Sequence, residues 1–257
     1  PGEPAALVGM AWHYGRLPLA KSLAPAIRIA RNGYQPDDRM LSELHDRAKV
    51  IGRYPGSAAL LLPDGKPPQR GWVFRNPDIA DTLERIAKDG DAGFYRGEFA
   101  KKLVDGVRAA GGNWTLADLE NYQVKERAPI AFDYRPPGKP AYHIVSASPP
   151  SSGGIVLQEM LNILSGFDLD KMDRAQRVHT IVEAMRRGYR DRTQYLGDPD
   201  FVQMPLAKLA SMDYADKLRE SIEPDRATPS SALPGADVKP ASMHTTHFSV
   251  TDADGNM

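Results

Sequence analysis

The sequence TTHFSVT at residues 245–251 determines how the rest of this chain is interpreted. Its β-branched and aromatic residues predict a β-strand, and the segment DADGN at residues 252–256 is typical of a hairpin turn. The partner strand of that hairpin would begin at Met257, where the sequence stops. Because a strand without its partner leaves backbone groups unpaired, we expect the natural protein to continue.

The segment before this strand, residues 228–242, is rich in proline, serine and alanine. Such a composition predicts an exposed linker that runs into the strand. Before the linker, prolines and acidic residues alternate from residue 197, with one helix expected at residues 206–222.

Further towards the N-terminus the hydrophobic pattern predicts mostly helices. Ser22 is expected to cap one helix, and Thr115 with Asp118 resembles a capping box that opens another. Two short apolar runs read as strands. The expected helices lie at residues 22–32, 36–50, 77–89, 98–110, 115–122, 155–164 and 175–195, and the expected strands at 130–134 and 142–145. The composition and spacing therefore predict an α+β fold with a buried helical core.

The composition excludes several classes of function. The 33 Lys and Arg residues balance 33 Asp and Glu residues, so the net charge is +0 and a general nucleic-acid binder is not expected. No apolar run approaches the roughly 18 residues that a membrane-spanning helix needs. The absence of cysteine removes disulfides, thiolate metal sites and a cysteine nucleophile. We expect no cofactor.

Two sets of charged residues on the predicted helix at 175–195 are candidate sites. His179 and Glu183 are one helical turn apart, but no third ligand is spaced to complete a metal site, so a surface hydrogen bond is favoured. A cluster of arginines favours a solvated face, or a contact within the parent fold, over a phosphate site. It consists of Arg186, Arg187, Arg190 and Arg192.

Three shorter motifs are also candidate binding sites. Asp198 and Asp200 flank Pro199, which favours turn capping. The loop SSGG at residues 151–154 precedes a helix and could hold an anion, but it lacks the lysine and spacing of a phosphate loop, so a tight strand-to-helix turn is preferred. His244 and His247 are three apart in an extended run, which places their rings on opposite faces and makes a poor chelate. We expect no metal site.

The segment at residues 245–256 closely resembles the start of the small subunit of the γ-glutamyltransferases, also called γ-glutamyltranspeptidases or glutathione hydrolases. Further motifs resemble the large subunit of that family, in the family's order along essentially the whole chain. They are PGEP at 1–4, YGRLP at 14–18, PAI at 25–27, GFYRG at 93–97, Asp118-Leu119 with Tyr122, PPSSGG at 149–154 and GDP at 197–199.

The resemblance implies a fold, a division of the chain and a nucleophile. The parent fold is the four-layer αββα sandwich of N-terminal nucleophile hydrolases, of which this chain would carry mainly helices and a few strands. Residues 1–244 would be the C-terminal part of the large subunit, with 228–244 as an exposed linker, and residues 245–257 the truncated first strand and turn of the small subunit. The precursor would cut itself between His244 and Thr245, leaving Thr245 as the catalytic residue.

This chemistry is physically coherent. A threonine hydroxyl is a poor nucleophile until a base takes its proton, and a free α-amine on the same residue, with a pKa of about 8, can act as that base. Before the cut this nitrogen belongs to an amide and is not basic. The residues often found before the cut in the family, a Glu-Ser pair and Gln, are replaced here by Ala241-Ser242 and His244, which bears on the rate of processing.

The implied reaction transfers a γ-glutamyl group from glutathione or a related amide to water or an amino acid, through an ester on Thr245. The family's oxyanion glycines and most substrate contacts belong to small-subunit residues after Met257, and a carboxylate-binding arginine to residues before Pro1. Gly153 and Gly154 match a large-subunit motif and are not those glycines. We therefore expect residues 1–257 by themselves to be inactive.

Two other interpretations remain open at this stage. The chain could belong to an acylase of the same scaffold that acts on glutaryl-type amides, or to a helical binding module that is never processed. The expected partners are the small-molecule substrate, acceptor amino acids or water, and the remainder of the large and small subunits. The resemblance also implies a periplasmic or extracellular location.

Overall fold

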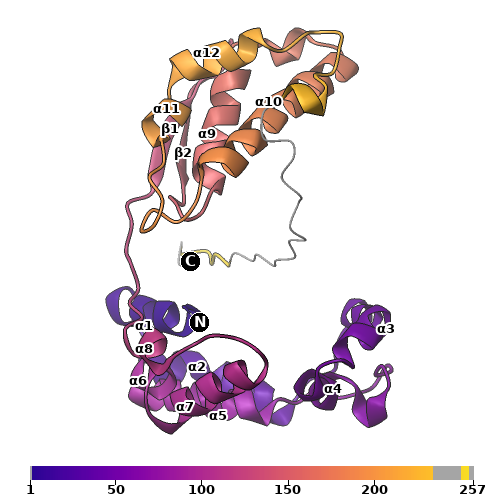
Figure 1. Ribbon diagram of the computed structural model, residues 1–257, viewed down its shortest axis with the longest axis vertical. Helices are drawn as coiled ribbons and strands as arrows, with labels where there is room; N and C mark the ends of the chain where they lie inside the picture. The colour runs from indigo at the N-terminus through magenta and orange to yellow at the C-terminus, as the bar shows by residue number, and fades with distance from the viewer. Residues whose placement is uncertain (1, 234–249, 255–257) are drawn as a thin grey trace. The chain divides into compact units, whose positions relative to one another are not determined.

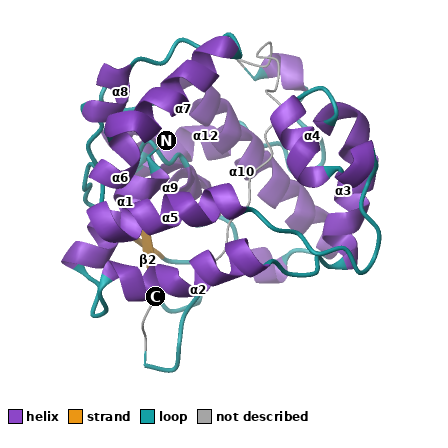
Figure 2. Cartoon of the chain, turned by 90° about the horizontal axis from the view of Figure 1, so that it is seen from below, coloured by secondary structure: helices purple, strands orange, loops and turns teal. Residues whose placement is uncertain are grey.

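The computed structural model describes residues 2–233 and 250–254. The chain divides into two compact units, Pro1–Glu126 and Arg127–Met257 (Figure 1). Figure 2 shows that helices make up most of the chain, with loops between them. The predicted α+β composition, mainly helical with few strands, is confirmed.

The first unit is entirely helical among its described residues, apart from one isolated backbone bridge between Tyr34 and Phe74. Its helices are α1 Glu3–His13, α2 Leu19–Asn32, α3 Asp38–Ile51, α4 Pro55–Leu61, α5 Pro77–Asp89, α6 Ala92–Tyr95, α7 Gly97–Ala109 and α8 Leu116–Glu120, with a 3₁₀ turn at Pro63–Gly65.

The ends of α5 follow directly from its sequence. The side chain of Asn76 accepts a hydrogen bond from the backbone N–H of Ile79, and Pro77 occupies the first turn, where its missing N–H costs nothing. Gly90 ends the helix with a positive φ of 59°, a conformation that favours glycine. The helix packs against α2. The sequence prediction for residues 77–89 is confirmed.

The capping box at α8 is also confirmed. Thr115 accepts a hydrogen bond from the N–H of Asp118, and the Asp118 carboxylate accepts one from the N–H of Thr115. The hydrogen bonds that the Asp118 carboxylate accepts from the hydroxyl and from the backbone N–H of Thr115 lower the pKa of Asp118. The helix ends at Glu120, two residues before the predicted end at Tyr122.

In the first unit one prediction was wrong and two helices were missed. Helix α2 begins at Leu19, so Ser22 lies inside it and does not cap it, because the N–H groups of Lys21 and Ser22 already bond to the carbonyl of Pro18. Helices α1 and α4 were not predicted. Both are apolar over most of their length, and neither has a side chain that caps its first turn, so periodicity and capping signals were weak.

The second unit combines a small sheet with helices. Its elements are β1 Ile130–Tyr134, β2 Tyr142–Ser146, α9 Gly153–Leu164, α10 Arg174–Tyr195, α11 Leu206–Leu209 and α12 Met212–Glu220, with 3₁₀ turns at Leu169–Lys171 and Ser230–Ala232. The two strands pair antiparallel, with Ile130 opposite Ser146 and Tyr134 opposite Tyr142. Helix α9 packs against both strands and against α10 and α12 (Figure 1).

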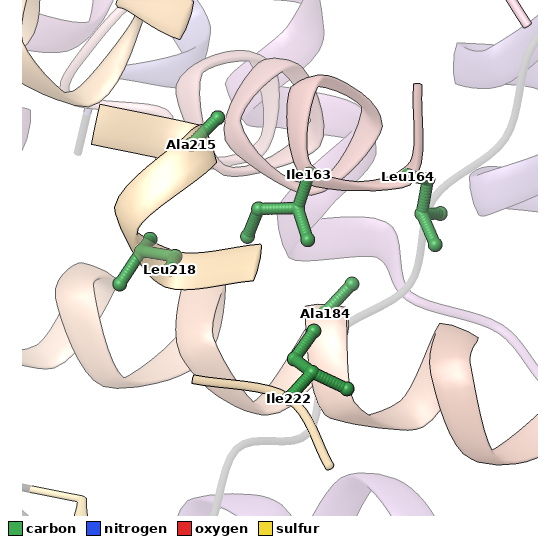
Figure 3. Close-up of a cluster of buried hydrophobic side chains, with 6 residues drawn as sticks. All are labelled: Ile163, Leu164, Ala184, Ala215, Leu218 and Ile222. Carbon is green, nitrogen blue, oxygen red and sulfur yellow. The ribbon is translucent and has the colours of Figure 1, made fainter. Parts of the chain in front are cut away.

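The core of this unit lies between α9, α10 and α12. Figure 3 shows its buried side chains, which come from these three helices and from the residues just after α12. They are Ile163, Leu164, Ala184, Ala215, Leu218 and Ile222. Ile163 and Ala184 are fully buried, so the predicted buried helical core is present in this unit.

Helix α10 buries charged residues and exposes apolar ones. Its buried positions include Glu183, Arg187 and Asp191, which are 0–1% exposed. Its exposed positions include Val178 and Tyr189, which are 53% and 54% exposed. The helix predicted at residues 175–195 is therefore present, and its buried positions combine these charged residues with small ones such as Ala184.

The predicted helix at residues 206–222 is broken into α11 and α12. The side chain of Ser211 accepts a hydrogen bond from the N–H of Tyr214, so Ser211 caps a new helix instead of continuing the old one. At the C-terminal end, Val250 and Thr251 pair with no other strand among the described residues. The N–H of Asp254 bonds to the carboxylate of Asp252, which agrees with the predicted turn.

No helix in the described part of the chain is long and apolar enough to cross a membrane.

Candidate functional site

The predicted nucleophile Thr245 and the residue before the predicted cut, His244, lie outside the described residues. Their assignment therefore stays a prediction. The structure does describe residues up to Leu233, which lead towards this junction, and again from Val250. The contacts that hold the start of the linker, at Thr228, are therefore described.

Thr228, the first residue of the predicted linker, is anchored to Glu183 of α10. Its hydroxyl donates to Glu183 Oε2 at 2.6 Å, and its backbone N–H donates to Oε1 at 3.2 Å. Because Glu183 is only 1% exposed, these bonds are shielded from water. We call Glu183, Arg186, Arg187 and Thr228 the α10 anchor. It fixes the chain at the point where the linker begins.

Arg187 is the central cation of the α10 anchor and is fully buried. Its Nη1 donates to Glu183 Oε2 at 2.6 Å. The rest of its guanidinium bonds to the C-terminal end of α12, with Nε donating to the carbonyl of Leu218 at 3.1 Å and Nη2 to that of Ser221 at 2.8 Å. Arg186 adds a second ion pair, from its Nη1 to Glu183 Oε1 at 2.6 Å. The anchor thus joins α10, α12 and the linker.

The charge state of Glu183 follows from these contacts. Burial by itself would raise the pKa of Glu183, but hydrogen bonds from Thr228, Arg187 and Arg186 outweigh it and lower the pKa to about 2. Glu183 is therefore an anion at neutral pH, matched by two guanidinium groups.

The sequence predictions for this helix were partly wrong. Glu183 is buried, and no surface hydrogen bond joins it to His179, whose Nε2 instead lies 2.7 Å from the carbonyl oxygen of Glu223. The solvated face expected for the arginine cluster is contradicted by Arg187, while the alternative, a contact within the fold, is confirmed. The spacing of these residues shows that they lie close together on the helix, but it does not show whether they face solvent or the core.

The loop at residues 151–154 is a tight strand-to-helix turn, as preferred from the sequence. It leads from β2 into α9, and the Ser152 hydroxyl accepts a hydrogen bond from Arg192 Nε at 2.8 Å. A Cβ placed on Gly154 would lie 2.5 Å from the carbonyl oxygen of Ala147, whereas one on Gly153 would meet only Ser151 Oγ at 3.8 Å. The loop therefore needs a glycine at residue 154, where the backbone of Ala147 packs closely.

This difference gives a matched test. We expect Gly154→Ala to lower the free energy of unfolding by about 2 kcal/mol, because the backbone of Ala147 must move to admit the methyl group. Gly153→Ala should be neutral, or stabilising by about 0.5 kcal/mol, because its methyl group has room and alanine favours the helix. Urea unfolding followed by circular dichroism measures both. Equal losses in the two variants would contradict the packing argument.

Asp198 and Asp200 form a turn, as expected. The N–H of Asp200 bonds to Asp198 Oδ1 at 3.0 Å, an arrangement in which the side chain caps the turn. Arg127 Nη2 lies 2.9 Å from Asp200 Oδ1, so the turn is also held to the start of the second unit. Within residues 2–233 and 250–254, no three His, Cys, Asp or Glu side chains are grouped as a metal site would require.

Comparison with known proteins identifies the family. The family model described as Gamma-glutamyltranspeptidase matches residues 1–257. The chain belongs to the gamma-glutamyltranspeptidase family.

Relatives within and around the gamma-glutamyltranspeptidase family are similar over nearly the whole chain. A glutathione hydrolase proenzyme of Pseudomonas sp. (strain A14) is 41% identical over 99% of this chain, and an Acylase ACY 1 proenzyme of Pseudomonas sp. (strain SE83) is 38% identical over 95%. The crystal structure of Helicobacter pylori gamma-glutamyltranspeptidase superposes with a TM-score of 0.85 at 35% identity, covering 95% of this chain and 70% of that one. The fold class expected from the resemblance is confirmed.

The chain spans 44% of the length of the Pseudomonas glutathione hydrolase proenzyme and 43% of the acylase proenzyme. It therefore corresponds to less than half of the length of either relative.

Sequence reasoning missed the α10 anchor as a unit. The signal was present, because Glu183 and Arg187 are four residues apart and a carboxylate placed before an arginine at that spacing favours an ion pair. What the sequence did not contain was the third partner, Thr228, which is 45 residues away from Glu183.

Proposed function

We propose that the whole protein is an acyl-transfer enzyme that acts on glutathione and related γ-glutamyl amides, with Thr245 as its nucleophile. The observation that carries the proposal is the family match over residues 1–257, supported by the 41% identity to a protein named glutathione hydrolase proenzyme. The word proenzyme in that name is consistent with activation by a cut, for which Thr245 is the candidate.

The first proposed step is cleavage of the peptide bond between His244 and Thr245. The Thr245 hydroxyl attacks the carbonyl carbon of His244, the C–N bond breaks as the nitrogen takes up the hydroxyl proton, and water hydrolyses the resulting ester to release the carboxyl end of His244. The cut converts the amide nitrogen of Thr245 into an α-amine with a pKa of about 8, so that a base becomes available beside the hydroxyl. The α10 anchor supports this step because it holds the chain at Thr228. Any rearrangement that the cut requires can then be confined to the linker after Thr228.

The second step is transfer. The Thr245 hydroxyl attacks the γ-amide carbonyl, and its proton passes to the α-amine. When the tetrahedral intermediate collapses, the C–N bond breaks, the ammonium group returns the proton to the leaving amine, and a γ-glutamyl ester remains on Thr245. Water or an amino acid then attacks the ester and releases the hydroxyl. The oxyanion donors that this chemistry needs are not assigned to residues 1–257, so activity is proposed for the whole protein only.

A second candidate function is favoured by a specific relative. The 38% identity to a protein named Acylase ACY 1 proenzyme favours an acylase as the alternative, and we propose glutaryl-type amides as the substrates of such an acylase. A glutaryl group lacks the α-amino group of a γ-glutamyl group. A site that holds this amino group should therefore disfavour the glutaryl amide by about 10²-fold or more.

We expect the purified full-length protein to separate into two chains, the smaller beginning at Thr245, and to cleave glutathione faster than a glutaryl amide at equal concentration. Edman sequencing of the smaller chain and initial rates on both substrates check these outcomes. The reverse preference would identify the acylase. A precursor that stays intact on long incubation would favour a non-catalytic binding module instead. We also propose a periplasmic or extracellular location, which cell fractionation checks.

A further inference from the structure

A second buried charged cluster lies further along α10, where Asp191 follows Arg187 of the α10 anchor by one helical turn, and is not used by the proposed chemistry. It contains Glu159 of α9, Arg190 and Asp191 of α10, Lys208 of α11 and Tyr214 of α12. Glu159 is 1% exposed and Asp191 is fully buried. Four helices therefore meet at a point where two acidic side chains face each other away from water.

The hydrogen bonds show how Asp191 is satisfied as an anion. Arg190 Nε donates to Asp191 Oδ1 at 2.6 Å, and the hydroxyl of Tyr214 donates to Oδ2 at 2.6 Å. Arg190 Nη2 donates to the same Tyr214 hydroxyl at 3.0 Å. Asp191 thus has a guanidinium counter-ion and a phenol donor, both held in place by each other.

Glu159 has no comparable support. Its Oε1 atom is buried without a hydrogen-bond partner, and the negative charge that acts on it is that of Asp191. Two ionised carboxylates cannot share a hydrogen bond, because one of them must supply a proton. Arg190 already serves Asp191, and the ammonium group of Lys208 lies over the rings of Tyr195 and Tyr214, at 4.9 Å and 4.6 Å from their centroids. The residue of β1 that packs in this region, Ile130, is apolar.

We propose that Glu159 carries a proton at neutral pH and donates it to Asp191, so that a single shared proton joins α9 to α10 and makes the stability of the second unit sensitive to pH. Loss of that proton would place two negative charges in contact inside the core. The acid pair then repels, and the junction of α9 with α10 and α12 weakens.

The direction of the pH effect follows from linkage. Burial, followed by the charge of Asp191 and the hydrogen bond to it, raises the pKa of Glu159 from 4.5 to about 9, against the opposing charges of Arg190 and Lys208. Between these pH values the folded protein holds a proton that the unfolded chain has released, so folding takes up a proton and stability falls as pH rises. The contribution is complete below pH 4.5 and is lost by about pH 9.

Infrared spectroscopy of the full-length protein tests the protonation directly. We expect the C=O stretch of a protonated carboxylic acid at pH 7, and we expect that band to move when only the glutamate carboxyl carbons are labelled with carbon-13. Aspartates keep unlabelled carbons, so Asp91, whose pKa is also raised by burial, cannot produce the shift. Absence of a glutamic-acid band at pH 7 overturns the proposal without any variant.

The matched variant is Glu159→Gln, which keeps the shape and a donor for Asp191 but does not titrate. We expect it to melt at the same temperature as the wild type at pH 5 and at a higher temperature at pH 8.5, and to lose the acid band. The control, Glu43→Gln, alters an exposed glutamate and should follow the wild type at every pH. Melting temperatures of Glu159→Gln and wild type that run parallel from pH 5 to pH 8.5 would refute the proposal. Neither result depends on the nature of the proposed enzyme activity.

Discussion

A Thr245→Ala variant of the full-length protein should remain a single uncut polypeptide and should lose γ-glutamyl transfer by about 10⁴-fold or more. The effect is expected to be large because Thr245 has two proposed roles, one in the cut and one in transfer. The hydroxyl is the attacking group, and the cut that frees its neighbouring amine is proposed to occur at the same residue. Alanine removes the first and thereby prevents the second.

Two further variants make this result specific. Thr245→Ser keeps a hydroxyl at the same position, so it should still be cut and retain measurable transfer. Thr246→Ala removes the neighbouring hydroxyl and should be cut like the wild type. Gel electrophoresis over time and the release of a chromogenic amine from a γ-glutamyl anilide follow the two events. If Thr245→Ala yields two chains, or works within about tenfold of the wild type, Thr245 is not the nucleophile.

The second large effect concerns the α10 anchor. We expect Glu183→Gln to lower the free energy of unfolding by about 3 kcal/mol or more, because it leaves the guanidinium of Arg187 buried without a counter-ion. For a chain of this size, that loss corresponds to a fall of roughly 6–12 °C in melting temperature. Differential scanning calorimetry measures it.

The chain contains its own control for this prediction. Glu43 and Arg47 form an ion pair with the same four-residue spacing on α3, but their side chains are 57% and 56% exposed. Glu43→Gln should cost no more than about 0.5 kcal/mol, because water replaces the lost partner. If the two substitutions cost the same, burial does not decide the strength of the Glu183 pair.

The pH dependence of this pair has the opposite sign to that of Glu159. The folded pKa of Glu183 lies below its ordinary value, at about 2, so its contribution to stability is complete above about pH 4.5 and is lost as pH falls towards 2. Glu183→Gln should therefore flatten the acid limb of the stability profile.

Much of the fold could be predicted from the sequence because local signals were strong. Asn76, Pro77 and Gly90 specify both ends of α5, and Thr115 with Asp118 specifies the start of α8. These residues act on backbone groups within a few positions of themselves. A reader of the sequence needs no knowledge of distant contacts to use them.

The charged interior of the second unit could not be predicted in the same way. Glu159 is the only charged residue of α9, and Glu183 and Arg187 have the spacing of an ordinary surface pair. Their burial depends on α12 and on Thr228, which reach them only in the folded chain. Thr245 differs from these residues, because its proposed role was predicted from a sequence resemblance and not from contacts in the folded chain.

All of the groups that hold Thr228 precede the proposed scission at residues 244–245. Breaking the chain there would sever none of them, so maturation need not loosen this unit. The new carboxyl terminus would stay covalently connected to Thr228 through residues 229–244. A fully extended chain of that length spans roughly 55 Å. The α10 anchor would therefore join α10 to α12 in the cut protein just as it does in the uncut one.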